Sequence, residues 1–156
     1  MIRFVPTCDP VIITQIMTHP KVVGNMTHGS VEDIKNFQPP MQPYILKLLV
    51  YDGAELLGLL YFVAHSTVCW EQHTCLLPNA WGARSNRVFK ALQKYVWSSL
   101  ANIQRVILVI PESNKSALAC AKRNGLIQFG YNPKSLIRDG VLMGQYFFGI
   151  SRPEGA

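Results

Sequence analysis

The sequence predicts a single α/β domain of the mixed α+β kind, with one mixed, mostly antiparallel sheet and helices on both of its faces. Three observations predict this fold class. Strand-like and helix-like segments alternate along the chain, 156 residues suit one core, and a composition of 49% hydrophobic and 15% charged residues is typical of a compact protein. The sequence has no repeats, low-complexity tracts or linker-like stretches, so we expect residues 1–156 to form one domain.

The first third of the chain predicts a strand, a helix and a flap. Residues 1–5 form a short apolar strand. Over residues 9–17 apolar side chains recur at helical spacing, and Asp9 before a proline supplies a cap followed by proline in the first turn. Acidic residues in a first turn predict a second, short helix from Ser30, and three prolines then enforce an extended loop. We expect residues 19–43 to form a flap of helix and loop.

The middle of the chain predicts the central strands and a long helix. YILKLLVY and AELLGLLYFV flank Asp52-Gly53, a pair that favours the primed turn of a β-hairpin. A further strand over residues 67–77 ends at a proline. Residues 85–100 then show the period of an amphipathic helix. Its inward side chains are Phe89, Leu92, Val96 and Leu100, and its outer face carries Arg87, Lys90 and Lys94.

The last third predicts three more strands and one more helix. Residues 105–110 are a β-branched apolar run typical of a buried strand, and residues 113–124 form a helix that Gly125 ends. Two final strands, over residues 126–131 and 141–151, are expected to flank a loop that holds Pro133 and Asp139-Gly140. In this order the strands at 67–77 and 105–110 run parallel, joined through the helix at 85–100 by a right-handed crossover.

The net charge and the distribution of apolar residues limit the possible partners and locations of the chain. The formal net charge of +6 predicts an anionic partner, which could be nucleic acid, a phosphate-bearing cofactor or an acidic protein surface. Nucleic acid is supported by charge alone, because the sequence has no aromatic and basic signature of an RNA-binding sheet. The longest uncharged run, residues 56–70, is shorter than the roughly 20 residues of a membrane helix. The N-terminus lacks a secretory signal, so we expect no membrane span and a cytoplasmic location.

Cysteine and histidine spacing argues against a disulfide framework and against a metal site. The four cysteines lie far apart without a C-x-x-C pair, which fits reduced thiols. Four odd-numbered residues on one predicted strand look like a metal set, but side chains two and four positions apart on a strand are separated by about 7 and 13 Å. These distances are too large for one tetrahedral ion. The residues concerned are His65, Cys69, His73 and Cys75.

Two stretches of the sequence carry a family resemblance. LLPNAWGARSNRVFKALQKYVW reads as the end of a strand, a short turn with glycine and a helix, and ESNKSALACAKRNGL reads as N-x-x-A followed by a helix ending at Gly125. Together with the element order, these stretches resemble the GNAT superfamily of acetyl-coenzyme-A-dependent acyltransferases over roughly residues 44–151. Three short patterns are most similar to the phage-encoded branch of that superfamily, some of whose members are labelled head-assembly proteins of P22-like phages. They are H-P near the N-terminus, E-x-H before L-L-P-x-A-W-G, and S-L-x-x-x-G at residues 135–140.

The resemblance implies a binding site for acetyl-CoA. In the family, the pyrophosphate binds at the turn before the first of these helices, where backbone N–H groups at a helix start attract an anion and a glycine permits close approach. The family's asparagine beside the pantetheine arm corresponds to Asn114, for which a plain helix cap is the open alternative. The implied cofactor-binding residues are Leu76, Leu77, Gly82, Ala83, Arg84, Ser85, Asn86, Arg87 and Asn114.

Acetyl transfer to an amine requires that the amine lose a proton and that the thiolate product be stabilised. Glu71, His73 and Cys75 alternate on one predicted strand and therefore share a face. We expect Glu71 or His73 to act as the general base, and Glu71 matches the place where many GNAT enzymes carry a glutamate; a structural role for both is the alternative. The tyrosine acid of many family members corresponds to Ala121, which has no hydroxyl. Candidate substitutes are Cys120, Ser113 and Tyr131.

Two functions stay open from the sequence. The first is an N-acyltransferase that binds acetyl-CoA and transfers the acetyl group to an amine held by the flap of residues 19–43. The second is a non-catalytic GNAT-fold phage protein that acts in virion head assembly or contacts another protein, with virion proteins as its partners. A fold does not by itself decide between them.

Overall fold

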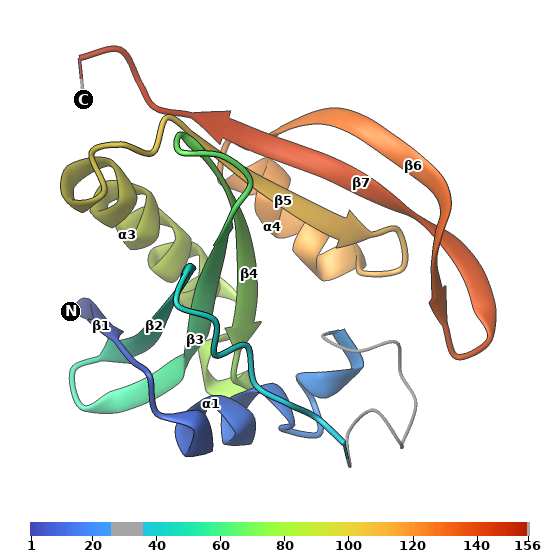
Figure 1. Cartoon of the computed structure of the whole chain (residues 1–156), viewed down its shortest axis with the longest axis horizontal. Coiled ribbons are helices and arrows are strands. Elements are labelled where there is room, and N and C mark those ends of the chain that lie inside the picture. Colours follow the sequence, from blue (N-terminus) through green and yellow to red (C-terminus); the bar gives the residue numbers. More distant parts are fainter. Residues whose placement is uncertain (26–35, 156) are drawn as a thin grey trace.

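A computed structural model gives the structure of the chain and describes residues 1–25 and 36–155. Seven strands form one sheet in the order β1-β2-β3-β4-β5-β7-β6 (Figure 1). The strands are β1 (Ile2–Pro6), β2 (Ile45–Asp52), β3 (Glu55–Ala64), β4 (Cys69–Leu76), β5 (Arg105–Pro111), β6 (Ile127–Arg138) and β7 (Val141–Ser151). The helices are α1 (Pro10–Met17), α3 (Ala83–Ser99) and α4 (Lys115–Arg123), with short 3₁₀ turns η1 (Val23–Asn25) and η2 (Pro78–Ala80).

The sheet is mixed and mostly antiparallel, as the sequence predicts. Among the pairs of described strands, β4 and β5 run parallel and the other five pairs run antiparallel. The helix α3 connects the two parallel strands, because parallel neighbours need a crossover rather than a tight turn. The predicted hairpin at Asp52-Gly53 is confirmed as the β2–β3 turn, where Gly53 has a φ of 62°. The second helix that we expect from Ser30 lies outside the described residues.

Two hydrophobic clusters cover opposite faces of the sheet, which confirms helices on both sides. Side chains of α3 and α4 pack with even-numbered residues of the central strands, among them Leu48, Leu60 and Phe62, and with Phe148. Side chains of α1 pack with Leu49, Leu59 and Cys75 on the other face. Residues two apart on a strand share a face, so the parity of the sequence number separates the two clusters on β2 and on β3 from Gly58 onward. The bulge opposite Val50 and Tyr51 reverses the parity at Leu56 and Leu57.

The helix ends follow the cap chemistry of the sequence. Asp9 caps α1, since its side chain accepts a hydrogen bond from the backbone N–H of Val11 at 2.9 Å. Asn114 caps α4 in the same way, accepting from Ala117 N–H at 3.2 Å. Gly125 follows α4 with a φ of 78°, the left-handed conformation that ends many helices. Of the helices in the described ranges, none has the length and apolarity needed to cross a membrane.

The prediction of a long loop between the last two strands is wrong. β6 continues to Arg138, and Asp139-Gly140 alone makes the turn to β7. The pairing register shifts between Asn132 and Leu136, and Lys134 has a φ of 51° within this bulge. Pro133 is tolerated because β6 is an edge strand, where a missing N–H need not break the ladder. The result is a long β6–β7 hairpin that extends past the other strands (Figure 1).

Candidate active site

The parallel strands β4 and β5 stay paired over a short stretch and then separate. Their register ends at Glu71 and Ile107, yet β4 continues to Leu76 and β5 to Pro111. Beyond this point β4 remains paired with β3, and β5 remains paired with β7. The two arrows diverge accordingly in Figure 1. The strands therefore enclose a wedge, whose facing backbone edges have no strand between them within the described part of the chain.

Glu71 and His73 lie beside the apex of this wedge, on the face of the sheet that α1 also covers. Both carboxylate oxygens of Glu71 lie close to a histidine: Oε2 accepts a hydrogen bond from Nε2 of His65 at 2.7 Å, and Oε1 lies 3.2 Å from Nε2 of His73, at ion-pair distance. The His73 ring stacks on Tyr61 of β3, with centroids 4.4 Å apart and planes 6° from parallel. The predicted alternation is thus confirmed for Glu71 and His73, because their side chains meet on one face.

Burial sets the protonation states around this pair. Burial lowers the pKa of His73, while the Glu71 carboxylate opposes that shift and His65 adds to it. His73 is therefore neutral near pH 7 and has a lone pair that can accept a proton. Burial also raises the pKa of the Tyr61 phenol well above its ordinary value and that of the Cys75 thiol to about 12. Both groups keep their protons at neutral pH.

The helix α3 begins without a side-chain cap. Gly82, at the N-cap position, has a φ of 72° and a ψ of −133°. Glycine has no side chain, so no cap hydrogen bond reaches the first backbone N–H groups of α3 from this position. Gly82 and Ala83 are exposed. Trp81 ties this start to the end of β4, because its indole N–H donates to the carbonyl of Leu76 at 2.9 Å. Exposed, uncapped N–H groups at a helix start form a site suited to an anion.

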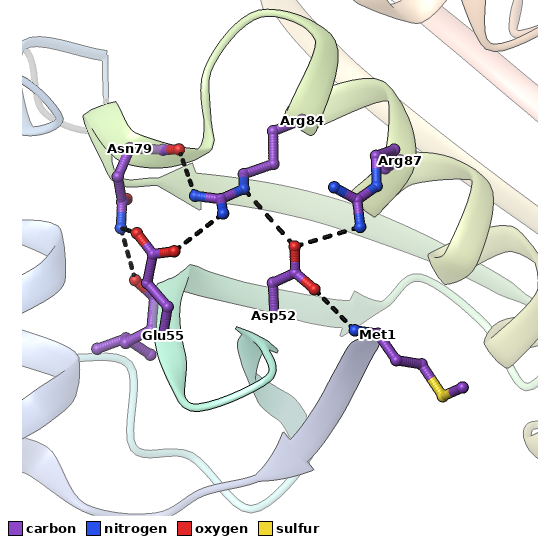
Figure 2. A network of polar contacts seen from close by, with 7 residues as sticks. Met1, Asp52, Glu55, Asn79, Arg84 and Arg87 are labelled. Carbon is purple, nitrogen blue, oxygen red and sulfur yellow. Dashed lines mark hydrogen bonds and ion pairs between the residues drawn. The ribbon is translucent and has the colours of Figure 1, made fainter.

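The two arginines of this turn are already paired with carboxylates (Figure 2). Arg84 contacts Glu55 at 2.9 Å and Asp52 at 3.7 Å, and Arg87 contacts Asp52 at 3.2 Å. Both acids flank the β2–β3 turn, and Asp52 also accepts from the N-terminal ammonium of Met1 at 2.8 Å. Asn79 and Arg84 lower the pKa of Glu55 through hydrogen bonds, so this carboxyl stays ionised. The two guanidinium groups therefore point to the β2–β3 turn.

Four other predicted cofactor residues have structural roles that are visible here. Asn86 accepts a hydrogen bond from the amide of Asn124 at 3.3 Å and so ties α3 to α4. Ser85 donates to the carbonyl of Gly82 at 2.7 Å. Leu76 is buried in the cluster under α3, and Leu77 donates its backbone N–H to Leu57 at 2.8 Å. These contacts hold the end of β4 and the start of α3 in place.

Asn114 is a helix cap, which confirms one of its two open roles. Its Oδ1 accepts from Ala117 N–H, as described above, and from the Ser116 hydroxyl at 3.1 Å. Within the described residues, the amide nitrogen of Asn114 makes no hydrogen bond. That nitrogen keeps its capacity to donate, because the cap uses the oxygen alone.

The candidate substitutes for the missing tyrosine acid are occupied or poorly suited. Ala121 is buried in α4 and carries no hydroxyl. The pKa of Cys120 is raised by burial, and the Ser113 hydroxyl contacts the sulfur of Met143 at 3.2 Å. Tyr131 donates to Glu112 at 2.7 Å, a bond that raises the pKa of the phenol. A raised pKa makes each titratable candidate a weaker acid.

Sequence reasoning missed His65 and Tyr61 as neighbours of the Glu71–His73 pair. The sequence alone presents His65 only as a possible metal ligand, and the described residues hold no group of three or more ligating side chains placed for a metal ion. The missed signal is a histidine in the β3–β4 turn, six positions before Glu71. Such a turn brings its first residues back against the following strand, and cross-strand pairing places Tyr61 opposite His73.

Comparisons with known proteins identify the fold. The sequence matches no family model and no curated protein sequence. The structure is similar to that of spermidine N-acetyltransferase from Vibrio cholerae in complex with CoA and spermine, with a TM-score of 0.76, 14% identity, and coverage of 97% of this chain and 95% of that one. A variant of the same enzyme gives a TM-score of 0.71 at 13% identity, with coverage of 97% and 95%. This chain therefore has the GNAT-like α/β fold that the sequence predicts.

Proposed function

We propose that the chain is an N-acyltransferase that takes the acetyl group of acetyl-CoA and transfers it to an amine. The observation that carries this proposal is the position of a neutral histidine, paired with a carboxylate, beside the apex of the wedge between β4 and β5. An extended ligand arm fits between two diverging strand edges, where backbone groups can bind it as a further strand would. The proton acceptor then lies beside the place where that arm ends.

The start of α3 and the wedge together suit the two ends of the acetyl donor. We assign the pyrophosphate to the backbone N–H groups from Gly82 to Asn86, and the pantetheine arm to the wedge beside Asn114. Leu76 and Leu77 would border the arm at the end of β4. Because Arg84 and Arg87 are paired with Asp52 and Glu55, we expect them to hold the turn in shape and to add positive charge near the phosphates.

The chain's own residues supply the proton acceptor for the reaction. Amines are protonated near pH 7, so one proton must leave before the nitrogen can attack. We assign that proton to Nδ1 of His73, with the Glu71 carboxylate 3.2 Å from Nε2 of the same ring. The nitrogen then forms the new C–N bond to the acetyl carbon, the C–S bond breaks, and the electron pair leaves on sulfur. The amine nitrogen then loses its second proton, which reaches the thiolate through water because Ala121 offers no hydroxyl.

The acceptor amine is not carried over from the similar structure. Spermine is named for the enzyme from Vibrio cholerae alone. This chain has a net charge of +6, which disfavours the approach of a polycation. We therefore expect an acceptor with one amine and a neutral or anionic remainder.

A non-catalytic role in virion assembly remains the second candidate. Two observations favour the absence of turnover in this candidate: Ala121 stands where the family carries its acid, and the arginines of the α3 turn are paired within the protein. A protein with this role could keep the fold and the donor site without turnover. In that case the partners would be virion proteins, and replacing Glu71 or His73 would leave assembly intact.

Turnover and its dependence on the base test the proposal. Release of the CoA thiol should be followed with a panel of amines from pH 6 to 9. We expect Glu71→Gln and His73→Ala to lower kcat about a hundredfold or more, because a positioned base contributes about a hundredfold to ten-thousandfold. Exposed Lys94→Ala on the outer face of α3 is the control and should match the wild type. Turnover that is equal in all four proteins would contradict the assignment of the base.

A further inference from the structure

The Glu71 carboxylate lies between two histidines, His65 and His73. The proposed function gives a role to His73 but none to His65. The contact with His65 is a hydrogen bond of 2.7 Å, whereas Nε2 of His73 lies 3.2 Å from the other carboxylate oxygen. The His65 side chain is 48% exposed, whereas that of Glu71 is 15% exposed. A surface histidine thus reaches inward to a largely buried carboxylate that is the direct partner of the proposed base.

His65 is itself fixed by the β3–β4 turn. Its backbone N–H donates to the carbonyl of Cys69 at 2.9 Å. The hydroxyl of Ser66 accepts from the backbone N–H of Val68 and of Cys69, at 3.3 and 3.1 Å. A turn with these bonds at its base holds the first position of the turn against the start of β4. These bonds hold the backbone of His65 beside the start of β4, from where its ring reaches Glu71.

The orientation of Glu71 decides which nitrogen of His73 is free. A carboxylate oxygen beside Nε2 favours the proton on that nitrogen and so leaves the lone pair on Nδ1. Tyr61 fixes the plane of the His73 ring but not its tautomer. With His73 as its sole partner, the carboxylate could rotate about its last torsion, which is broad for glutamate. A second donor on Oε2 removes that freedom.

The other charged and titratable groups near this trio do not replace His65. Cys75 and Tyr61 keep their protons, as shown above, and α1 contributes no charged residue to this face. Lys47 of β2, opposite Tyr61, donates to the carbonyl of Ile45 at 3.0 Å. Arg105 of β5, opposite Cys69, donates to Ser151 at 3.0 Å. Among the described residues, His65 is the second donor to Glu71.

We infer that His65 is a positioning residue: it holds the Glu71 carboxylate on Nε2–H of His73 and so leaves Nδ1 of His73 directed to accept the amine proton. The inference rests on the proposed function for its catalytic meaning, but the geometry can be tested without turnover. His65 donates a hydrogen bond and passes no proton. A glutamine at this position has an amide nitrogen at a similar reach and should donate the same hydrogen bond to Glu71.

The test compares His65→Ala with His65→Gln and with Thr67→Ala, an exposed control in the same turn. In the kinetic arm, we expect His65→Ala to lower kcat about tenfold or more with KM for acetyl-CoA unchanged, since losing a residue that orients a ligand typically costs about 10- to 100-fold. His65→Gln should recover most of that loss, and Thr67→Ala should match the wild type. Equal kcat in His65→Ala and the wild type would overturn the inference, and so would a His65→Gln protein as slow as His65→Ala.

A second arm uses no substrate, so that it can fail separately from the proposed function. The ring N–H proton on Nε2 of His73 exchanges slowly with water only while it is hydrogen-bonded, and ¹⁵N-correlated NMR of the ring can detect it. We expect this signal in the wild type and in His65→Gln, and its loss by exchange in His65→Ala and Glu71→Ala. If the signal persists in His65→Ala, His65 does not position Glu71. If the NMR result is as expected but no amine is acetylated, the positioning stands and the proposed function fails.

Discussion

At the scale of single residues, the site depends on one neutral histidine, His73, whose surroundings shift its pKa in opposite directions. Burial favours the neutral form of His73, while the Glu71 carboxylate favours the charged form. The net effect lowers the pKa, which keeps the lone pair available at neutral pH. The same balance limits the strength of the base, because a lower pKa means a weaker proton acceptor. The carboxylate offsets part of that loss when the proton arrives.

The lowered pKa of His73 predicts a pH dependence of stability. The folded state binds the proton more weakly than the unfolded state, whose histidine titrates near pH 6.5. The stabilising contribution is therefore fully present above about pH 6.5 and is lost as pH falls through the lower pKa of the folded state. We expect His73→Gln to flatten the loss of unfolding free energy in this window, measured by urea titrations from pH 5 to 7.5. An identical slope in both proteins would show that another group titrates there.

At the scale of elements, the end of β4 determines where α3 begins. Gly58 of β3 lies opposite Leu76, the last residue of β4, and opposite Val50 at the bulge in β2. Leu76 in turn accepts the indole N–H of Trp81, directly before the start of α3. The strand contact at Gly58 therefore fixes the edge of the wedge and the helix start together.

Replacing Gly58 should disturb both the edge of the wedge and the start of α3. Its φ is 144°, and a Cβ there would lie 2.8 Å from Cα of Leu76 and against the backbone of Cys75. We expect Gly58→Ala to lower the unfolding free energy by about 2 kcal/mol or more, from strain and overpacking combined, and to weaken binding of CoA. Gly24→Ala is the matched control, since a Cβ at Gly24 meets nothing within 4 Å. Equal denaturation midpoints for both variants would contradict this account of β4.

At the scale of the whole molecule, the sequence predicts the element order well because that order is local. The caps Asp9 and Asn114 and the turn at Gly53 use residues a few positions apart, so their chemistry is readable from the chain. The continuation of β6 through Pro133 was missed, because an edge position is a property of the finished sheet.

The candidate site was predictable in part for the same reason. Strand alternation places Glu71 and His73 on one face, as two residues of one strand must lie. The pairing of Arg84 with Glu55 and Asp52 joins segments about thirty positions apart, and nothing in either segment indicates it. The bond from His65 to Glu71 depends on how the β3–β4 turn closes. Contacts that tertiary structure creates between unrelated segments leave no local pattern.

The central claim is that the start of α3 and the wedge bind acetyl-CoA, and a calorimetric titration of acetyl-CoA and CoA tests it most directly. Ala83 is the first residue of α3, where proline is well tolerated but removes one backbone N–H. We expect the wild type and Ala83→Ser to bind both ligands, and Ala83→Pro to bind about tenfold more weakly, as expected for one lost hydrogen bond to a charged group. No heat of binding in the wild type at millimolar ligand, or equal affinity for Ala83→Pro with an unchanged melting temperature, would contradict the account.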